Sequence, residues 1–210
     1  LPGADQHFAD PTHGLAVRGS PPLGRSGNGS SSHGRSDETV GGCGVSGLRI
    51  GLISDTHGHL DKKLFDFLEE CDEIWHAGDI GTLSLAEKLA TFRPLKAVWG
   101  NIDGPEIRFE YPEQQLFDCE GMKILMLHIG GYPGRYARGV RALLKKEQPD
   151  VFICGHSHIV RAMPDEKLGL IHLNPGACGR QGFHLEKTIM RFTIEKGEMS
   201  KFQICRLGNR

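Results

Sequence analysis

The sequence predicts an α/β fold in which two mixed sheets pack face to face, with helices on their outer sides. From residue 48, short apolar runs alternate with segments whose apolar residues recur at helical spacing, which is typical of parallel βαβαβ units. From Arg161 onward the chain reads instead as strands separated by turn residues, which indicates antiparallel pairing. A chain of 210 residues has room for one or two domains.

Residues 1–47 are predicted to form no part of this fold. They are rich in Gly, Ser and Pro and hold no periodic apolar run, so they bury too little apolar surface to offset chain entropy. They also lack the basic start and the apolar stretch of a signal peptide. We expect a disordered tail or linker, or a segment introduced by cloning, followed by one domain over residues 48–210.

The first half of this domain contains three predicted strands and two predicted helices. The strands are short apolar runs at residues 48–54, 73–77 and 95–99. Between them, apolar residues recur at helical spacing in residues 60–71 and 83–90. The links between these elements are short, which favours a parallel sheet with the helices outside.

The second half adds one helix and more strands. The helix is predicted from Tyr136 to Leu144, where apolar residues again follow helical spacing. A turn at Glu120-Gly121 separates the first two strands. The predicted strands cover residues 115–118, 122–128, 151–154, 168–174, 188–194 and 201–206.

Charge and cysteine content restrict the class of protein. Lys and Arg total 25 and Asp and Glu total 26, which argues against a protein that grips nucleic acid or an anionic membrane through bulk charge. No apolar run approaches the roughly 18–20 residues of a membrane helix. The six cysteines are widely spaced and form no CxxC pair, as expected of reduced thiols in a cytoplasmic protein.

Metal-binding residue types follow five of the predicted strands. Ligands of open α/β sheets bind beyond the carboxyl ends of the strands, so these side chains are expected to converge. Oxygen and nitrogen donors without thiolates argue against a closed structural zinc site. Seven donors are too many for one ion, and they suit two ions about 3.5–4 Å apart. The donors are Asp55, His57, Asp79, Asn101, His128, His156 and His158.

Taken singly, these residues carry less weight. An Asp at a strand end is often a turn or helix-cap residue, and a lone His in an apolar run, such as His76 or His172, is usually a core residue. The ordered set DxH, GD, GNxD, H and GHxH resembles the calcineurin-like metallophosphoesterases, particularly their small YfcE-type phosphodiesterases. The resemblance spans residues 48–206 and implies a four-layer α/β/β/α sandwich.

The same resemblance implies a binuclear metal centre with Asp79 as the bridge. One ion is then held by Asp55, His57, Asp79 and His158, and the other by Asp79, Asn101, His128 and His156. Mn²⁺ is the first expectation, and Fe, Zn and Ni also suit these ligands. A hydroxide between the ions is expected to attack phosphorus in line with the leaving oxygen, with Asn101 and His128 offsetting charge on the phosphoryl oxygens.

One position departs from the family pattern. Many members carry a His directly after the Asn of the GN motif, as a proton donor or phosphate clamp, whereas this chain has Ile102. YfcE-type members commonly lack this His too and favour phosphodiesters over monoesters. We therefore expect a metal-dependent phosphodiesterase acting on a small diester, with Asp103 as a candidate acid.

Substrate contacts and partners are less sharply indicated. His59, Asn174 and Arg138 are candidate substrate-binding residues; Arg138 is expected to share a helix face with Arg135, Arg141 and Lys145, and His184 is taken as an exposed loop residue. A homodimer is compatible with the family. Two other functions compete: an inactive scaffold for protein assembly, as in the retromer scaffold subunit of this family, and a nuclease, which the neutral charge disfavours.

Overall fold

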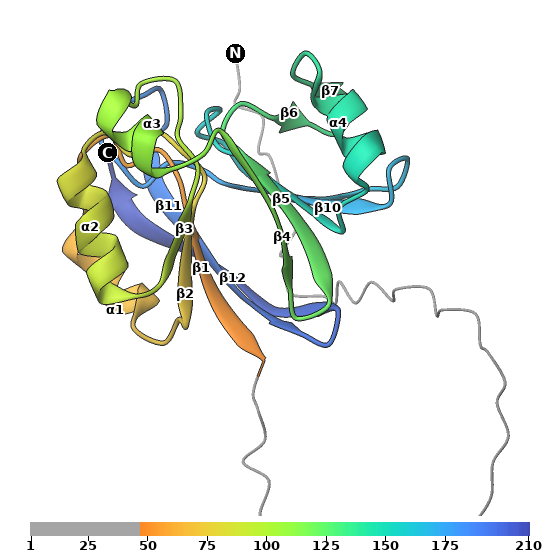
Figure 1. Cartoon of the computed structure of the whole chain (residues 1–210). Helices are drawn as coiled ribbons and strands as arrows, with labels where there is room; N and C mark the ends of the chain where they lie inside the picture. Colours follow the sequence, from red (N-terminus) through yellow and green to blue (C-terminus); the bar gives the residue numbers. More distant parts are fainter. Residues whose placement is uncertain (1–46) are drawn as a thin grey trace, which may run out of the picture.

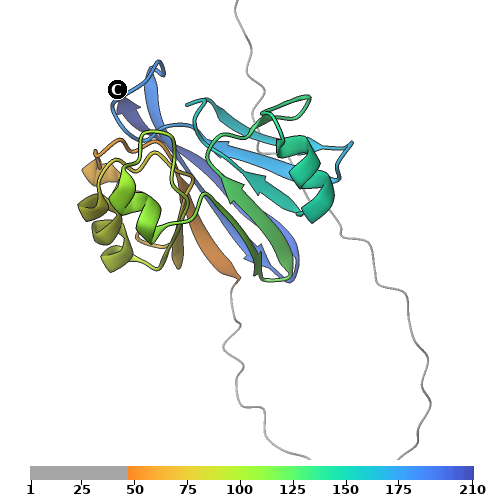
Figure 2. The ribbon, with the colours of Figure 1, turned by 45° about the horizontal axis from the view of Figure 1, so that its top comes forward.

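The structure, a computed structural model, describes residues 47–210 (Figure 1). The predicted tail, apart from Gly47, lies outside the described residues. Two five-stranded mixed sheets face each other, with helices covering both outer faces (Figures 1 and 2). This α/β/β/α arrangement confirms the predicted fold class.

The first sheet contains the predicted parallel unit. Its strand order is β12-β11-β1-β2-β3, and β1, β2 and β3 run parallel. The last two strands of the chain extend it in antiparallel fashion beside β1. The elements are β1 (Leu48–Ile53), α1 (Lys62–Leu68), β2 (Glu73–His76), α2 (Leu83–Phe92), β3 (Leu95–Ala97), β11 (Glu186–Glu195) and β12 (Glu198–Asn209).

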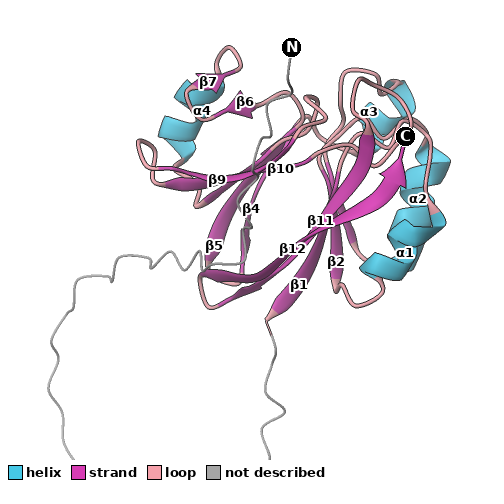
Figure 3. Ribbon diagram, turned by 180° about the vertical axis from the view of Figure 1, so that it is seen from behind, coloured by secondary structure: helices cyan, strands magenta, loops and turns pink. Residues whose placement is uncertain are grey.

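The second sheet is built from the middle of the chain. Its order is β4-β5-β8-β10-β9, in which β5, β8 and β10 are parallel and the two edge strands are antiparallel. The helix α4 (Val140–Glu147) covers its outer face (Figure 3). The strands are β4 (Gln114–Cys119), β5 (Met122–Leu127), β8 (Val151–Ile153), β9 (Val160–Asp165) and β10 (Leu170–Pro175).

Apolar side chains fill three layers of core. Between the sheets, Trp75 and Phe192 of the first sheet pack in one buried cluster with Met126 of the second. Leu64 and Leu89 bury α1 and α2 against the outer face of the first sheet. Because both faces of the central strands are covered, β5 and β8 are nearly continuous apolar runs, whereas the edge strands β4 and β12 alternate between covered and exposed residues.

Four elements were not predicted, and one helix begins later than expected. The four are α3 (Pro105–Glu110), β6 (Gly131–Tyr132), β7 (Arg135–Tyr136) and β9 (Val160–Asp165). The predicted helix from Tyr136 is wrong at its start, because Gly139 takes a φ of +85° and α4 begins only after it. Arg135 and Arg138 consequently lie before the helix and do not share a face with Arg141.

Two further expectations can be compared with the described part of the chain. No helix there is both long and apolar enough to cross a bilayer. Its five cysteines are free thiols, and four of them are buried. Burial raises the pKa of the Cys154 and Cys178 thiols to about 12, so these two behave as small apolar side chains.

Candidate metal centre

The strand-end residues meet at one edge of the molecule, where β1, β2, β5 and β8 end. Two groups of three residues form there, and within each group the donor atoms lie within 4.8 Å of one another. The β1 and β2 loops contribute the carboxylates, and the loops after β5 and β8 contribute imidazoles from the facing sheet. The groups are Asp55, His57 and His158, and Asp79, His128 and His156.

In the first group, two hydrogen bonds orient the Asp55 carboxylate toward the histidines. Its Oδ2 accepts from Ser54 Oγ at 2.6 Å and from the backbone N–H of His156 at 3.1 Å. Its Oδ1 is left free and lies 3.1 Å from His158 Nε2 and 3.9 Å from His57 Nε2. One oxygen is therefore fixed to the protein, while the other faces the centre of the group.

The second group is oriented in the same manner. His128 Nδ1 donates to the carbonyl of Ala77 at 2.8 Å, which turns Nε2 toward Asp79 Oδ2 at 3.2 Å. Asp79 Oδ1 accepts the backbone N–H of Ile102 at 3.1 Å. Asp79 Oδ2 also lies 3.8 Å from His57 Nε2 of the first group, so this oxygen stands between the two groups.

Several donor atoms at this edge are buried but have no hydrogen-bond partner: Asp55 Oδ1, His57 Nε2 and His128 Nε2. A buried polar atom left unpaired typically costs about 1–3 kcal/mol. Divalent cations would satisfy all three atoms at once, and imidazole with carboxylate is a donor set that Mn, Fe, Zn and Ni accept. The residues present thus fit a metal centre.

The backbone at this edge is held in an uncommon conformation. Positive φ angles between 48° and 65° occur at five of the proposed ligands, all of them residues with a Cβ. Such conformations cost of order 1–3 kcal/mol each, and they concentrate at functional sites where the surrounding fold enforces them. The five are Asp55, His57, Asp79, His156 and His158.

Two glycines let neighbouring strands approach these ligands. A Cβ at Gly100 would lie 2.1 Å from Asp79 Oδ1, and one at Gly78 would lie 2.6 Å from His128 Nδ1. Both distances are far below van der Waals contact. The ligands Asp79 and His128 can therefore take their observed positions only beside residues without a side chain.

Charge coupling shifts the pKa of two central groups. Burial alone would lower the pKa of His128, but the carboxylates of Asp79 and Asp55 outweigh it and raise this pKa. Burial would raise the pKa of Asp79, but His128, the Ile102 N–H and His57 lower it. In the metal-free protein the pair therefore favours an imidazolium beside a carboxylate, and a bound cation would compete with that proton.

Two buried residues tie the ligand loops together. His76 donates from Nε2 to Thr56 Oγ1 at 2.9 Å and accepts the Gly78 N–H at Nδ1, and burial lowers its pKa to about 4. Asp103 accepts three backbone N–H groups, from Ile80, Gly81 and Gly100, at 2.7–3.1 Å. With both oxygens occupied and its side chain buried, Asp103 is placed to hold two loops and not to donate a proton to substrate.

The predicted substrate contacts are placed differently from one another. Asn174 is buried, and its amide donates to Gly155 O at 2.8 Å and to Ser157 Oγ at 3.2 Å, so it supports the loop that carries His156 and His158. His59 is half-buried beside the charges of Arg180 and Lys187. Asn101 and Arg138 are exposed and line a cavity that also contacts His128.

His184 is a residue whose position the sequence did not reveal. It is half-buried, and its Nε2 donates to Gly179 O at 3.1 Å, so its Nδ1 is the acceptor toward His158 Nδ1 at 3.0 Å. This contact directs the other nitrogen of His158 to Asp55. A Cβ at Gly182 would lie 2.0 Å from His158 Nδ1, which shows how closely this loop packs on the ligand. The glycines around His184 are the only sequence signal for such close packing.

Comparison with known proteins agrees with this geometry. Residues 48–197 match the calcineurin-like phosphoesterase superfamily domain. A probable metallophosphoesterase of Methanothermobacter thermautotrophicus is 32% identical over 137 residues, covering 62% of this chain and 77% of that protein. A phosphodiesterase of Methanocaldococcus jannaschii is 24% identical over 147 residues, covering 62% and 84%.

The fold is shared with solved structures as well. Vps29 of Chaetomium thermophilum superposes with a TM-score of 0.62 at 16% identity, covering 76% of this chain and 94% of that one. At this identity the likeness concerns the fold alone. The match over residues 48–197, together with the two donor groups, shows that this chain belongs to the calcineurin-like phosphoesterase superfamily.

Proposed function

We propose that the protein is a phosphodiesterase that works with two divalent cations, Mn²⁺ being the first candidate. The observation that carries this proposal is the pair of adjacent three-residue donor groups with Asp79 Oδ2 between them. Two such cations supply a nucleophile at neutral pH by lowering the pKa of water, and they offset charge on phosphoryl oxygens. Hydrolysis adds water to the diester and yields a monoester and an alcohol.

Different residues of the chain would bind the two cations and the phosphate. Asp55, His57 and His158 would hold one cation, and Asp79, His128 and His156 the other. Asn101 follows β3 and lines the cavity beside His128, and we assign its amide to the second cation and to a phosphoryl oxygen. Asp55 accepts from Ser54 and from the His156 N–H, and His128 donates to Ala77 O, so these hydrogen bonds keep both groups in position before substrate arrives, which is the arrangement that electrostatic catalysis requires.

The side chain that follows Asn101 favours diesters over monoesters as substrates. Ile102 is 46% exposed there and can neither donate a proton nor bind an anion. Asp103 is occupied by backbone amides, so the leaving group must take its proton from water. A monoester dianion needs more positive charge than a diester anion, and this chain lacks the additional imidazole. The Methanocaldococcus jannaschii relative named a phosphodiesterase supports the same choice.

The test is hydrolysis of bis-p-nitrophenyl phosphate by chelator-stripped protein, with and without Mn²⁺. We expect hydrolysis only with the metal, and we expect Asp79→Asn to abolish it because the shared carboxylate loses its charge. Asp118→Asn, which neutralises an exposed Asp on β4, is the matched control and should retain activity. Wild-type activity in Asp79→Asn would refute the two-metal account.

The second candidate function is a scaffold for protein assembly, to which the exposed Ile102 at the mouth of the centre would contribute. Absence of hydrolysis with Mn²⁺, Fe²⁺, Zn²⁺ and Ni²⁺ would favour it over the enzyme. The five free cysteines of the described residues support our expectation of a reducing, cytoplasmic setting for either function.

A further inference from the structure

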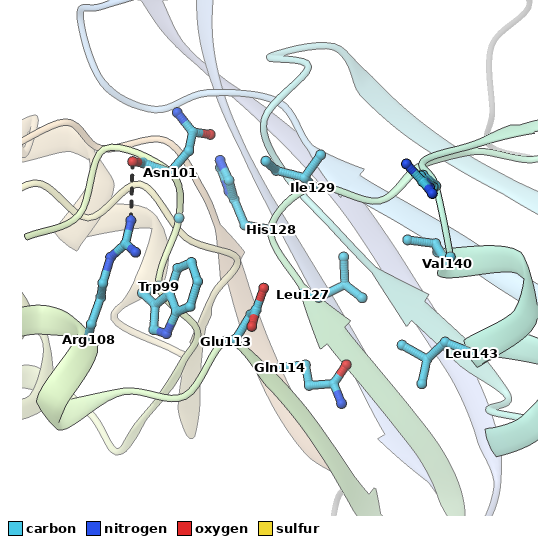
Figure 4. A pocket seen from close by; sticks show the side chains of 13 residues that line it. Trp99, Asn101, Arg108, Glu113, Gln114, Leu127, His128, Ile129, Val140 and Leu143 are labelled. Carbon is cyan, nitrogen blue, oxygen red and sulfur yellow. Dashed lines mark hydrogen bonds between the residues drawn. The ribbon is translucent and has the colours of Figure 1, made fainter.

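A cavity of about 380 Å³ lies directly beside the candidate metal centre (Figure 4). One end is formed by Asn101 and His128, which the proposed function places at the reaction. From there the cavity extends along the end of β5 to α4. This volume falls within the range of small-molecule sites, and the cavity is continuous with residues that would contact phosphate.

Apolar side chains form one part of the wall of this cavity, beside polar ones such as Gln114. Trp99, Leu127, Ile129, Val140 and Leu143 contribute apolar side chains from β5, α4 and adjoining loops (Figure 4). Leu127 and Val140 belong to the core beneath α4, whereas Ile129 is 45% exposed and directly follows His128. An exposed Ile beside a predicted ligand gains nothing from water, so burial by a bound apolar group would be favourable.

Charged residues also line the cavity. The Arg108 guanidinium stacks on Trp99 at 4.3 Å and donates to Asp103 O at 2.7 Å, so it is fixed as part of the wall. Arg138 and Glu113, both exposed, also line the cavity.

We propose that this cavity binds one esterified group of the substrate, an aryl or branched alkyl group, while the phosphate lies at the two donor groups. The inference rests on the proposed function and narrows its substrate class. The substrate is then a phosphodiester of an apolar alcohol or phenol. Ile129 and Leu143 are its specificity-determining contacts.

Direct binding tests this proposal without requiring turnover. Calorimetric titration of the Mn²⁺-loaded full chain with phenylphosphonate and with methylphosphonate compares two anions that differ only in the apolar group. We expect phenylphosphonate to bind at least about tenfold more tightly, given the apolar area that a phenyl ring buries beyond a methyl group. Ile129→Ser and Leu143→Ser should each reduce this ratio severalfold, with Mn²⁺ binding unchanged.

The matched control is Ile204→Ser on β12, which removes a 40% exposed Ile from another part of the surface and should leave the ratio unchanged. Equal affinities of the two phosphonates, or a ratio unaffected by both cavity variants, would overturn the proposal. If bis-p-nitrophenyl phosphate is hydrolysed but the phosphonates bind equally, only the cavity assignment fails. A phenyl preference without hydrolysis would instead refute the proposed activity and leave the cavity as a binding site.

Discussion

Replacing His184 by Ala is expected to weaken Mn²⁺ binding at the group that contains His158. In the wild-type chain, His184 accepts from His158 Nδ1 at 3.0 Å and is itself fixed by Gly179 O at 3.1 Å. The variant removes the hydrogen bond that orients the His158 ring toward Asp55. Loss of such an outer hydrogen bond typically weakens metal affinity 10–100-fold. Because the His158 side chain is only 13% exposed and keeps its packing, we expect about tenfold, or ~1.4 kcal/mol.

The measurement is a calorimetric titration of the chelator-stripped full chain with Mn²⁺, with urea unfolding at the same pH as a check on the fold. Phe183→Ala removes a fully exposed side chain from the same loop and is the matched control. His184→Gln keeps one donor and one acceptor and should recover part of the affinity. Two Mn²⁺ ions bound to His184→Ala with wild-type affinities would refute this reasoning.

Three further predictions concern single positions. Ile102→His should raise p-nitrophenyl phosphate hydrolysis at least tenfold, since a general acid typically contributes about 10²–10⁴-fold; an unchanged rate would mean that this position does not set the ester preference. Gly100→Ala should lower Mn²⁺ occupancy measured by elemental analysis, because its Cβ would displace Asp79 Oδ1, 2.1 Å away; full occupancy would contradict the crowding argument. His172 is buried against Phe152 with no hydrogen-bond partner, and burial lowers its pKa to about 4. The stability that depends on neutral His172 is complete above the unfolded pKa of about 6.5 and is lost as the pH falls toward 4. Between pH 7 and 5 the free energy of unfolding of wild type should therefore fall by ~2 kcal/mol relative to that of His172→Leu, as measured by urea unfolding. Parallel pH profiles of the two proteins would argue against this prediction.

Local sequence patterns were sufficient to predict much of the fold. The apolar runs at β1, β2 and β3 are long enough to be buried strands, and the helical spacing of Leu64 and Leu68 marks α1. These patterns involve residues close together in the sequence, so they can be recognised without knowledge of the tertiary packing. The start of α4 could not be predicted from spacing, because the apolar pattern begins at Tyr136 whereas the positive φ of Gly139 lets the helix begin only at Val140.

The sequence by itself determined which residues are chemically capable of binding metal and that they follow strand ends. Parallel strands bring their carboxyl ends to one edge, so the convergence of Asp55 and Asp79 is a consequence of topology that the pattern already contains. The family membership follows from the same ordered motifs.

Only the tertiary structure decided what the remaining polar residues do. Asp103 and Asn174 carry side chains suited to catalysis, yet backbone amides and carbonyls from distant loops consume their hydrogen-bonding capacity. His184 looks like an exposed loop residue in the sequence, yet it lies against His158 from 26 residues away. Hydrogen bonds between loops depend on how the loops are placed in space, which no local pattern encodes. For that reason the sequence identifies the candidate metal ligands, whereas only the fold shows which residues hold them in place.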